Sequence, residues 1–261
     1  MTRESDHVQW VAHGAVAICT LNRPDRRNAL TPSVWAALGK QIADLDADPS
    51  VRTIVLTGAG DAFCAGFDLD GLSSEDPAAR AERLATQSTF IGMLPPHDTP
   101  IIGAINGPAV TGGLELALSC DVLIASPSAR FADTHARVGA VPGGGLTILL
   151  PRRIGPGRAR LLSLTGTFID AATALDWGLI DLLVDADALL PRALEIGHQI
   201  AALPHAPIAE IRTMYDRFAD RSDAAAFAEE QAAARSWMVR RFDQARLTHE
   251  RDHIVADGRF S

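Results

Sequence analysis

The segment GPAVTGGLELALSCD, residues 107–121, combines a glycine pair, an apolar run typical of a helix and a single carboxylate, Glu115. Glycines between a strand and a helix expose the first helical N–H groups, which together with the helix dipole favour negative charge. The segment matches neither G-x-x-x-x-G-K-[ST] nor G-x-G-x-x-G, so an oxyanion is a better candidate than a nucleotide phosphate. A glycine turn that serves only packing explains the spacing equally well.

Glu115 stands between Leu114 and Leu116, so we expect its side chain to be mostly buried. A buried carboxylate is costly unless it is paired or hydrogen-bonded, and general bases are prepared in such surroundings. The alternative is a first-turn glutamate that only stabilises the helix N-terminus.

His135 follows in the segment RFADTHARVG, residues 130–139. A lone histidine is more often an ordinary surface or core residue than a catalyst. Its neighbours Asp133 and Arg137 fit solvated side chains equally well.

Outward from this segment, apolar patterns predict an α/β protein. Two short strands are expected around the His13–Gly14 turn, and a helix within 30–49 is expected to begin with Thr31 as N-cap and Pro32 as its first residue. The other expected strands lie at 51–58, 100–106, 121–126 and 180–184. Further helices are expected at 77–94, 144–150, 156–164, 170–177, 186–203, 206–219 and 223–244.

The composition excludes several functional classes. The 261-residue chain has a net charge of −8, which argues against a nucleic-acid-binding surface because phosphates require clustered Lys and Arg. Three widely spaced cysteines, Cys19, Cys64 and Cys120, predict reduced thiols in a cytoplasmic protein. We expect neither a signal peptide nor a membrane span, which would need about 18 consecutive apolar residues.

One motif suggests a metal, but its context does not. HERDH, residues 249–253, matches the zinc-protease pattern H-E-x-x-H. The third histidine of the longer motif is missing and Ala256 stands at its glycine position, so we expect a solvated terminal helix without zinc.

Two further segments supply candidate ligand contacts. NRPDRRNAL, residues 22–30, places Arg23, Arg26 and Arg27 close together, which suits a phosphorylated ligand but also fits a solvated turn. GDAFCAGFDL, residues 60–69, offers backbone N–H groups among small residues.

Taken in order along the chain, these segments resemble the crotonase superfamily, also called the enoyl-CoA hydratase/isomerase family. The resemblance rests on NRPDRRNAL, AFCAGFDL, GPAVTGGLELALSCD, RFADTHARVGAVPGGG and LTGTFIDAATALDWGLID. It implies a spiral core of β-β-α turns, expected at 1–195, and a helical trimerisation region, expected at 196–261. It also implies a homotrimer or a dimer of trimers.

The resemblance also assigns roles to residues. The backbone N–H groups of Phe67 and Gly112 would hold the thioester oxygen of an acyl-CoA. Glu115 matches the first of the two glutamates of the hydratases, whereas His135 stands at the position of the second. The expected substrate contacts are Arg23, Arg26, Arg27, Ala29, Ala65, Phe67, Asp68, Leu69 and Gly112.

The resemblance therefore predicts an enoyl-CoA hydratase-like lyase with Glu115 as base and His135 as acid. Two departures leave the reaction open: His135 replaces a carboxylate, and Phe67 stands where hydratases commonly have alanine and narrows the pocket. The alternatives are another reaction of the superfamily, such as double-bond isomerisation by Glu115 alone, or an acyl-CoA-binding protein without catalysis. No metal or redox cofactor is implied, because CoA arrives with the substrate. The C-terminal residues that help to cover CoA in the family have no clear match here.

Overall fold

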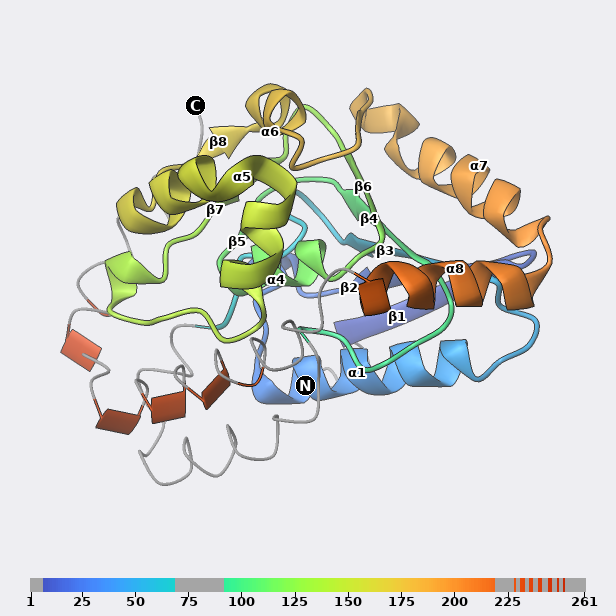
Figure 1. Cartoon of the computed structure of the whole chain (residues 1–261), viewed down its shortest axis with the longest axis horizontal. Helices are drawn as coiled ribbons and strands as arrows, with labels where there is room; N and C mark the ends of the chain where they lie inside the picture. The colour runs from blue at the N-terminus through green and yellow to red at the C-terminus, as the bar shows by residue number, and fades with distance from the viewer. Residues whose placement is uncertain are drawn as a thin grey trace.

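A computed structural model describes residues 7–68 and 92–218 and scattered positions between 228 and 251. Its larger sheet has six strands in the order β1-β2-β3-β4-β6-β9 (Figure 1). Only β1 and β2 are antiparallel, and the remaining neighbours are parallel. The strands are β1 (Val8–His13), β2 (Val16–Leu21), β3 (Thr53–Gly58), β4 (Ile101–Ile105), β6 (Val122–Ala125) and β9 (Leu182–Leu183).

A smaller sheet has three short strands, the first two of which follow β4 and β6 in the chain. It contains β5 (Ala109–Val110), β7 (Arg130–Ala132) and β8 (Ile169–Asp170), with β7 in the middle. Because β5 leads directly into α4 (Gly112–Leu118) and β7 leads to His135, this sheet brings the two candidate segments together.

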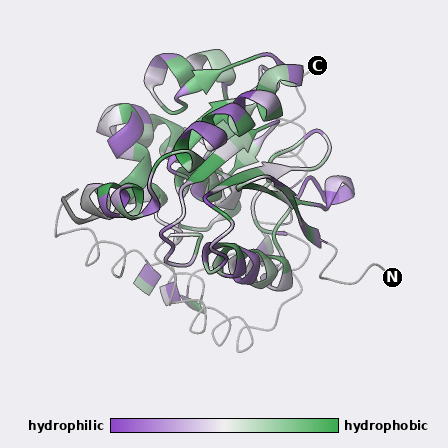
Figure 2. Ribbon diagram, turned by 90° about the vertical axis from the view of Figure 1, so that its right-hand side faces the viewer, coloured by the Kyte–Doolittle hydropathy of each residue, from purple (hydrophilic) through white to green (hydrophobic). Residues whose placement is uncertain are grey.

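Apolar side chains cover both faces of the larger sheet. Figure 2 colours much of the central strands as hydrophobic. On one face, α7 (Leu189–Ala201) packs Leu189 and Ala193 against Val55 and Ile102. The opposite face packs on α1 (Pro32–Asp46), which begins as predicted, with the Thr31 hydroxyl accepting a hydrogen bond from the backbone N–H of Val34 at 3.2 Å.

The later helices agree in part with the sequence pattern. The helices expected at 144–150 and 156–164 form one element, α5 (Leu146–Thr165), which is interrupted at Gly155 by a non-helical backbone with φ of 78°. α6 (Ala171–Trp177) follows as expected, but the strand expected at 180–184 is reduced to the two residues of β9. α7 runs through residue 195, where the division between core and helical region was expected, and that division stays a prediction. The helix expected at 77–94 lies almost wholly outside the described residues, and most of 223–244 does too.

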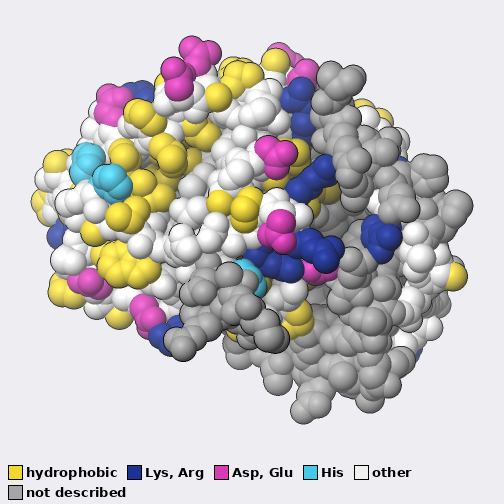
Figure 3. Space-filling view, turned by 180° about the vertical axis from the view of Figure 1, so that it is seen from behind, with side chains coloured by type: hydrophobic (Ala, Val, Ile, Leu, Met, Phe, Trp, Pro, Cys, Tyr) yellow, Lys and Arg dark blue, Asp and Glu magenta, His cyan; other side chains and the backbone are white. Residues whose placement is uncertain are grey.

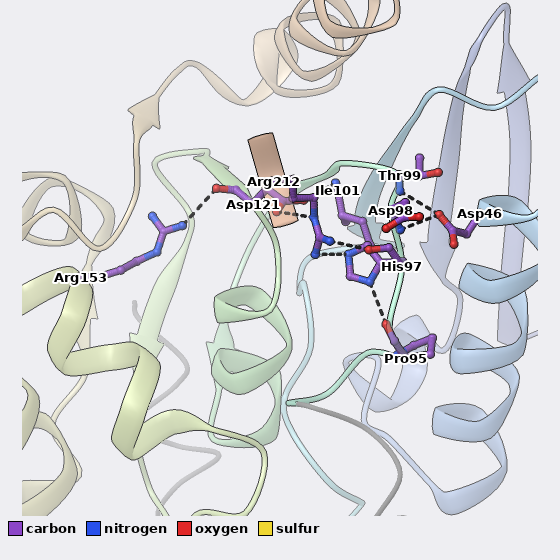
Figure 4. A network of polar contacts seen from close by, with 9 residues as sticks. All are labelled: Asp46, Pro95, His97, Asp98, Thr99, Ile101, Asp121, Arg153 and Arg212. Atoms are coloured by element: carbon purple, nitrogen blue, oxygen red, sulfur yellow. Dashed lines mark hydrogen bonds and ion pairs between the residues drawn. The ribbon is translucent and has the colours of Figure 1, made fainter. Parts of the chain in front are cut away.

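α8 (His205–Phe218) is attached to the sheet by a partly buried polar network around His97 (Figure 4). Arg212 donates from Nε to a carboxylate oxygen of Asp121 at 2.9 Å, and its Nη2 lies 2.9 Å from His97 Nε2. Asp121 also accepts the N–H of Ile101 at the start of β4, at 2.7 Å. His97 Nδ1 lies 2.8 Å from the carbonyl oxygen of Pro95. This carbonyl can only accept, so Nδ1 carries the ring proton and Nε2 accepts from Arg212.

The described part of the chain contains no helix long and apolar enough to cross a bilayer.

Candidate active site

The site is assembled where α4 packs against the loop before residue 68. Cys64 pairs with Ala109 in an isolated parallel bridge, which aligns this loop with β5. Gly113 makes the close approach possible, because a Cβ there would lie 1.9 Å from the carbonyl oxygen of Cys64. The glycine pair of the opening segment thus serves packing at Gly113 and leaves Gly112 as the first residue of the helix.

The two expected backbone donors, Phe67 and Gly112, lie close together. Leu30 pairs with Phe67 by donating to Gly66 and accepting from Asp68, at 2.7 and 2.9 Å, so the N–H of Phe67 points to the other side of the strand. The Phe67 ring lies beside Gly112, where a Cβ would be 3.0 Å from two ring carbons. The N–H of Gly112 begins α4 and therefore has no carbonyl partner earlier in that helix.

Thr111 turns the chain from β5 into α4 in a strained conformation. Its φ of 54° and ψ of −111° are rare for a β-branched residue, and such strain costs about 1–3 kcal/mol and is common at functional sites. Its hydroxyl lies 2.6 Å from the hydroxyl of Thr134 and accepts the N–H of Thr134 at 3.2 Å. The turn that carries the Gly112 N–H is thereby fastened to the segment that carries His135.

Glu115 is 1% exposed, and backbone donors hold its carboxylate. Oε1 accepts the N–H of Gly144 at 2.8 Å and that of Gly143 at 3.3 Å. Gly144 has no room for a side chain, because a Cβ there would lie 2.9 Å from the carboxylate carbon. The predicted burial of Glu115 is confirmed, and the 143–144 loop determines where its carboxylate points.

His135 is also buried, at 7% exposure, and its imidazole is paired with Asp133. Asp133 Oδ1 lies 2.6 Å from His135 Nδ1 and accepts the backbone N–H of His135 at 3.1 Å. Asp133 is 1% exposed, so the interpretation of this residue as a solvated neighbour is wrong. Burial raises the pKa of Asp133, but the hydrogen bond and the charge of the His135 side chain lower it. Hydrogen bonds from Ser163 and from the His135 backbone lower it further, and the pKa lies below its usual value.

The arginines of residues 22–30 lie in two different environments. Arg23 is half-buried and pairs with Asp68 at 3.2 Å, while its other guanidinium nitrogen donates to the carbonyl oxygen of Ala29. Arg26 is exposed and Arg27 half-buried, and the carbonyl oxygen of Arg27 accepts the N–H of Ala65 at 3.0 Å. The expected contacts Arg23, Ala29, Ala65, Phe67 and Asp68 therefore belong to one packed unit. Leu69 lies outside the described residues.

The Phe67 side chain forms one wall of this unit. Its ring packs edge-on against Trp35 of α1, with the ring centroids 5.5 Å apart. Trp35 is fixed in turn by a hydrogen bond from its indole N–H to the carbonyl oxygen of Met93 at 2.8 Å.

Comparison with known proteins agrees with this geometry. A sequence model described as enoyl-CoA hydratase/isomerase matches residues 12–245. The chain belongs to the enoyl-CoA hydratase/isomerase family. An Arabidopsis thaliana member of the family, named "Probable enoyl-CoA hydratase 1, peroxisomal", is 40% identical over 197 residues, or 72% of this chain and 69% of the relative. The crystal structure of an enoyl-CoA hydratase from Mycobacterium tuberculosis superposes with a TM-score of 0.79 at 40% identity, covering 89% of this chain and 97% of the other.

The family also includes relatives with other reactions. The Escherichia coli protein named 1,2-epoxyphenylacetyl-CoA isomerase is 36% identical over 194 residues, covering 72% of this chain and 74% of the relative. Membership in the enoyl-CoA hydratase/isomerase family thus confirms the predicted fold and leaves the choice of reaction to the residues of the site.

Sequence reasoning missed several contributors to the site, among them Asp133, Gly143 and Gly144. The spacing Asp133–Thr134–His135 carried a usable signal, because an aspartate commonly accepts the N–H two residues later. No comparable local signal existed for Gly143 and Gly144, since their contact with Glu115 depends on how the chain folds back.

Proposed function

We propose that this protein adds water across the 2,3-double bond of a trans-2-enoyl-CoA, or removes it in reverse, with syn geometry. The observation that carries the proposal is the fixed, buried carboxylate of Glu115 on the helix whose N-terminus offers the Gly112 N–H. Membership in the enoyl-CoA hydratase/isomerase family supplies the substrate class.

The proposed reaction uses a base, an acid and an oxyanion site. Glu115 takes a proton from water as the oxygen bonds to C3, and the double-bond electrons move toward the thioester. The N–H groups of Phe67 and Gly112 stabilise the enolate oxygen that develops. His135 donates a proton to C2, and the proton on Glu115 then returns to His135 through solvent. Each positioned acid or base contributes about 10²–10⁴-fold to the rate.

The CoA part is proposed to bind at the arginine segment. Arg26 is exposed there, Arg27 follows it directly, and Arg23 lies three residues before it. Because Arg23 is already paired with Asp68, we assign the attraction to CoA phosphates mainly to Arg26 and Arg27. Replacing both with alanine should weaken acyl-CoA binding, and added salt should reduce the difference from wild type because it screens the attraction.

We further propose a homotrimer or a dimer of trimers that works in the cytoplasm without a metal or redox cofactor. Hydrophobic side chains gather at the surface in the space-filling view (Figure 3), and a single chain leaves Leu164 77% and Tyr215 78% exposed. Association would cover such side chains. The three cysteines are free and buried, which suits a reducing compartment. Sedimentation at micromolar concentration tests the assembly, and a stable monomer would contradict it.

The direct test of function is the ultraviolet absorbance of a trans-2-enoyl-CoA, which is lost when water adds to the conjugated bond. We expect turnover of the 2-enoyl ester by the wild type. The family's description as hydratase/isomerase favours a second candidate, in which Glu115 alone moves a proton on a 3-enoyl-CoA. Turnover of only the 3-enoyl ester would support that isomerase, and calorimetric binding of a saturated acyl-CoA without any turnover would support a binding protein.

A further inference from the structure

We infer that Asp133 is a positioning residue for His135, the proposed acid. It orients the His135 imidazole and keeps this ring protonated. This inference rests on the hydratase function proposed above. It adds a residue to which the family resemblance gave no role.

The geometry fixes which ring nitrogen meets the substrate. One carboxylate oxygen of Asp133 receives both the backbone N–H and the Nδ1 of His135, at 3.1 and 2.6 Å. An ionised carboxylate only accepts hydrogen bonds, so Nδ1 must carry a proton. The proton that His135 gives or takes in the reaction is therefore the one on Nε2.

Asp133 is itself held from two directions. Its segment continues from β7, which pairs with β5 and β8 in the small sheet. From the other side, the hydroxyl of Ser163 on α5 hydrogen-bonds its side chain. The neighbouring Thr134 is bound to Thr111 at the start of α4, the helix of Glu115. These contacts tie the orientation of the His135 ring to the helix that carries the base.

The charge of Asp133 matters as much as its shape. Burial disfavours the charged form of an imidazole, so a buried histidine without a partner would be neutral and could not act as an acid. The low pKa of Asp133 arises partly from the His135 charge, and the same attraction acts in return on the imidazolium. The elements joined to this segment carry further charged side chains: Arg130 on β7, Glu115 on α4 and Arg137 on η4 (Ala136–Val138). The side chain of Arg137 lies against Gly166 at the end of α5.

A purely structural role makes a different prediction. If Asp133 only shaped the turn, an asparagine would serve as well, because its side-chain oxygen can accept the same backbone N–H. Asp133→Asn keeps the size and the acceptor but removes the charge. It therefore separates the two roles.

The experiment compares wild type with Asp133→Asn in hydration kinetics and in NMR spectra of protein labelled with [13C]histidine, in which His135→Gln identifies the His135 signal. We expect kcat to fall by about 10²-fold or more, with saturated acyl-CoA binding nearly unchanged. The alkaline limb of the kcat profile and the His135 titration should both move to lower pH. Ser163→Ala, which leaves the Asp133 charge in place, should lower kcat by less. If Asp133→Asn does not fold, the wild-type spectra serve instead, because a His135 ring that stays neutral throughout the pH range of activity would overturn the inference.

The outcomes separate this inference from the proposed function. If the wild type hydrates enoyl-CoA and Asp133→Asn retains its kcat, its pH profile and its His135 titration, the inference is wrong. If the wild type hydrates nothing, the proposed function fails, while the NMR titration still tests the Asp133–His135 pairing by itself.

Discussion

Two histidines of this protein, the buried His135 and the half-buried His97, have opposite partners. His135 is paired through Nδ1 with the carboxylate of Asp133, whereas His97 receives the guanidinium of Arg212 at Nε2 (Figure 4). An imidazolium is stabilised in the first setting and repelled in the second. The charge of the partner therefore helps to decide what a histidine does, in addition to its burial. The partner on its ring nitrogens prepares His135 for proton transfer and makes His97 a neutral acceptor that docks a helix.

The largest effect should come from replacing Glu115, the proposed base that acts together with His135. Glu115→Gln keeps the size of the side chain and an oxygen that accepts from Gly144, but it removes the basic carboxylate. We expect kcat for hydration to fall by about 10²–10⁴-fold, the usual contribution of positioned acid–base catalysis. Steady-state kinetics together with calorimetric binding of a saturated acyl-CoA measure it.

Retained hydration in Glu115→Gln would assign the base elsewhere. Equal loss of acyl-CoA binding and of kcat would show that the substitution damaged the pocket and not only the chemistry.

A smaller effect should follow from moving Glu115 without changing it. A Cβ at Gly144 would lie 2.9 Å from its carboxylate carbon, so Gly144→Ala must displace that group or the loop. A displacement of about 1 Å can cost up to about 10²-fold in rate. The matched control is Gly157→Ala in α5, where an added Cβ has no neighbour within 4 Å. Wild-type kcat in Gly144→Ala would show that the 143–144 loop does not position the base.

The smallest effect concerns His97 and pH. Burial and then the charge of Arg212 lower the pKa of His97, against the Pro95 carbonyl and the carboxylates of Asp121 and Asp46. The unfolded chain, with a histidine pKa of about 6.5, therefore binds the proton more readily than the folded one. The free energy of unfolding should thus fall as the pH decreases below about 6.5, by at most about 1.4 kcal/mol per pH unit from this group.

The control for that pH effect is His97→Gln, which offers an acceptor to Arg212 but does not titrate. Chemical unfolding at fixed protein concentration should show a weaker pH dependence in this variant between pH 5 and 7. Identical slopes in the two proteins would mean that His97 does not hold α8 in the way its contacts indicate.

Sequence and structure agree best where the signals are local. The β-branched run of β3 and the Thr31–Pro32 start of α1 were predictable because periodicity and capping depend on neighbours in the chain. The strands β5, β7 and β8, with two or three residues each, are too short for any period to show.

In the site, too, the features with local signals were predictable and those that depend on distant residues were not. Glu115 was predictable because apolar neighbours surround its carboxylate. The residues that hold it are separated from it by 28 and 29 positions, and only the folded chain brings them together. The roles of Phe67 and Gly112 came from the family resemblance and stay predictions. The assignment of His135 as acid also stays a prediction. The sequence shows only that a histidine replaces a glutamate there, and the structure adds its partner, Asp133.

The central claim is that His135 takes part in hydration, whereas the half-buried His97 does not. The most direct measurement is kcat for hydration of a trans-2-enoyl-CoA by His135→Gln and His97→Gln under the same conditions. We predict a fall of at least about 10²-fold in the first and no more than about a twofold change in the second. Wild-type kcat in His135→Gln, or an equal loss in both variants, would contradict the account.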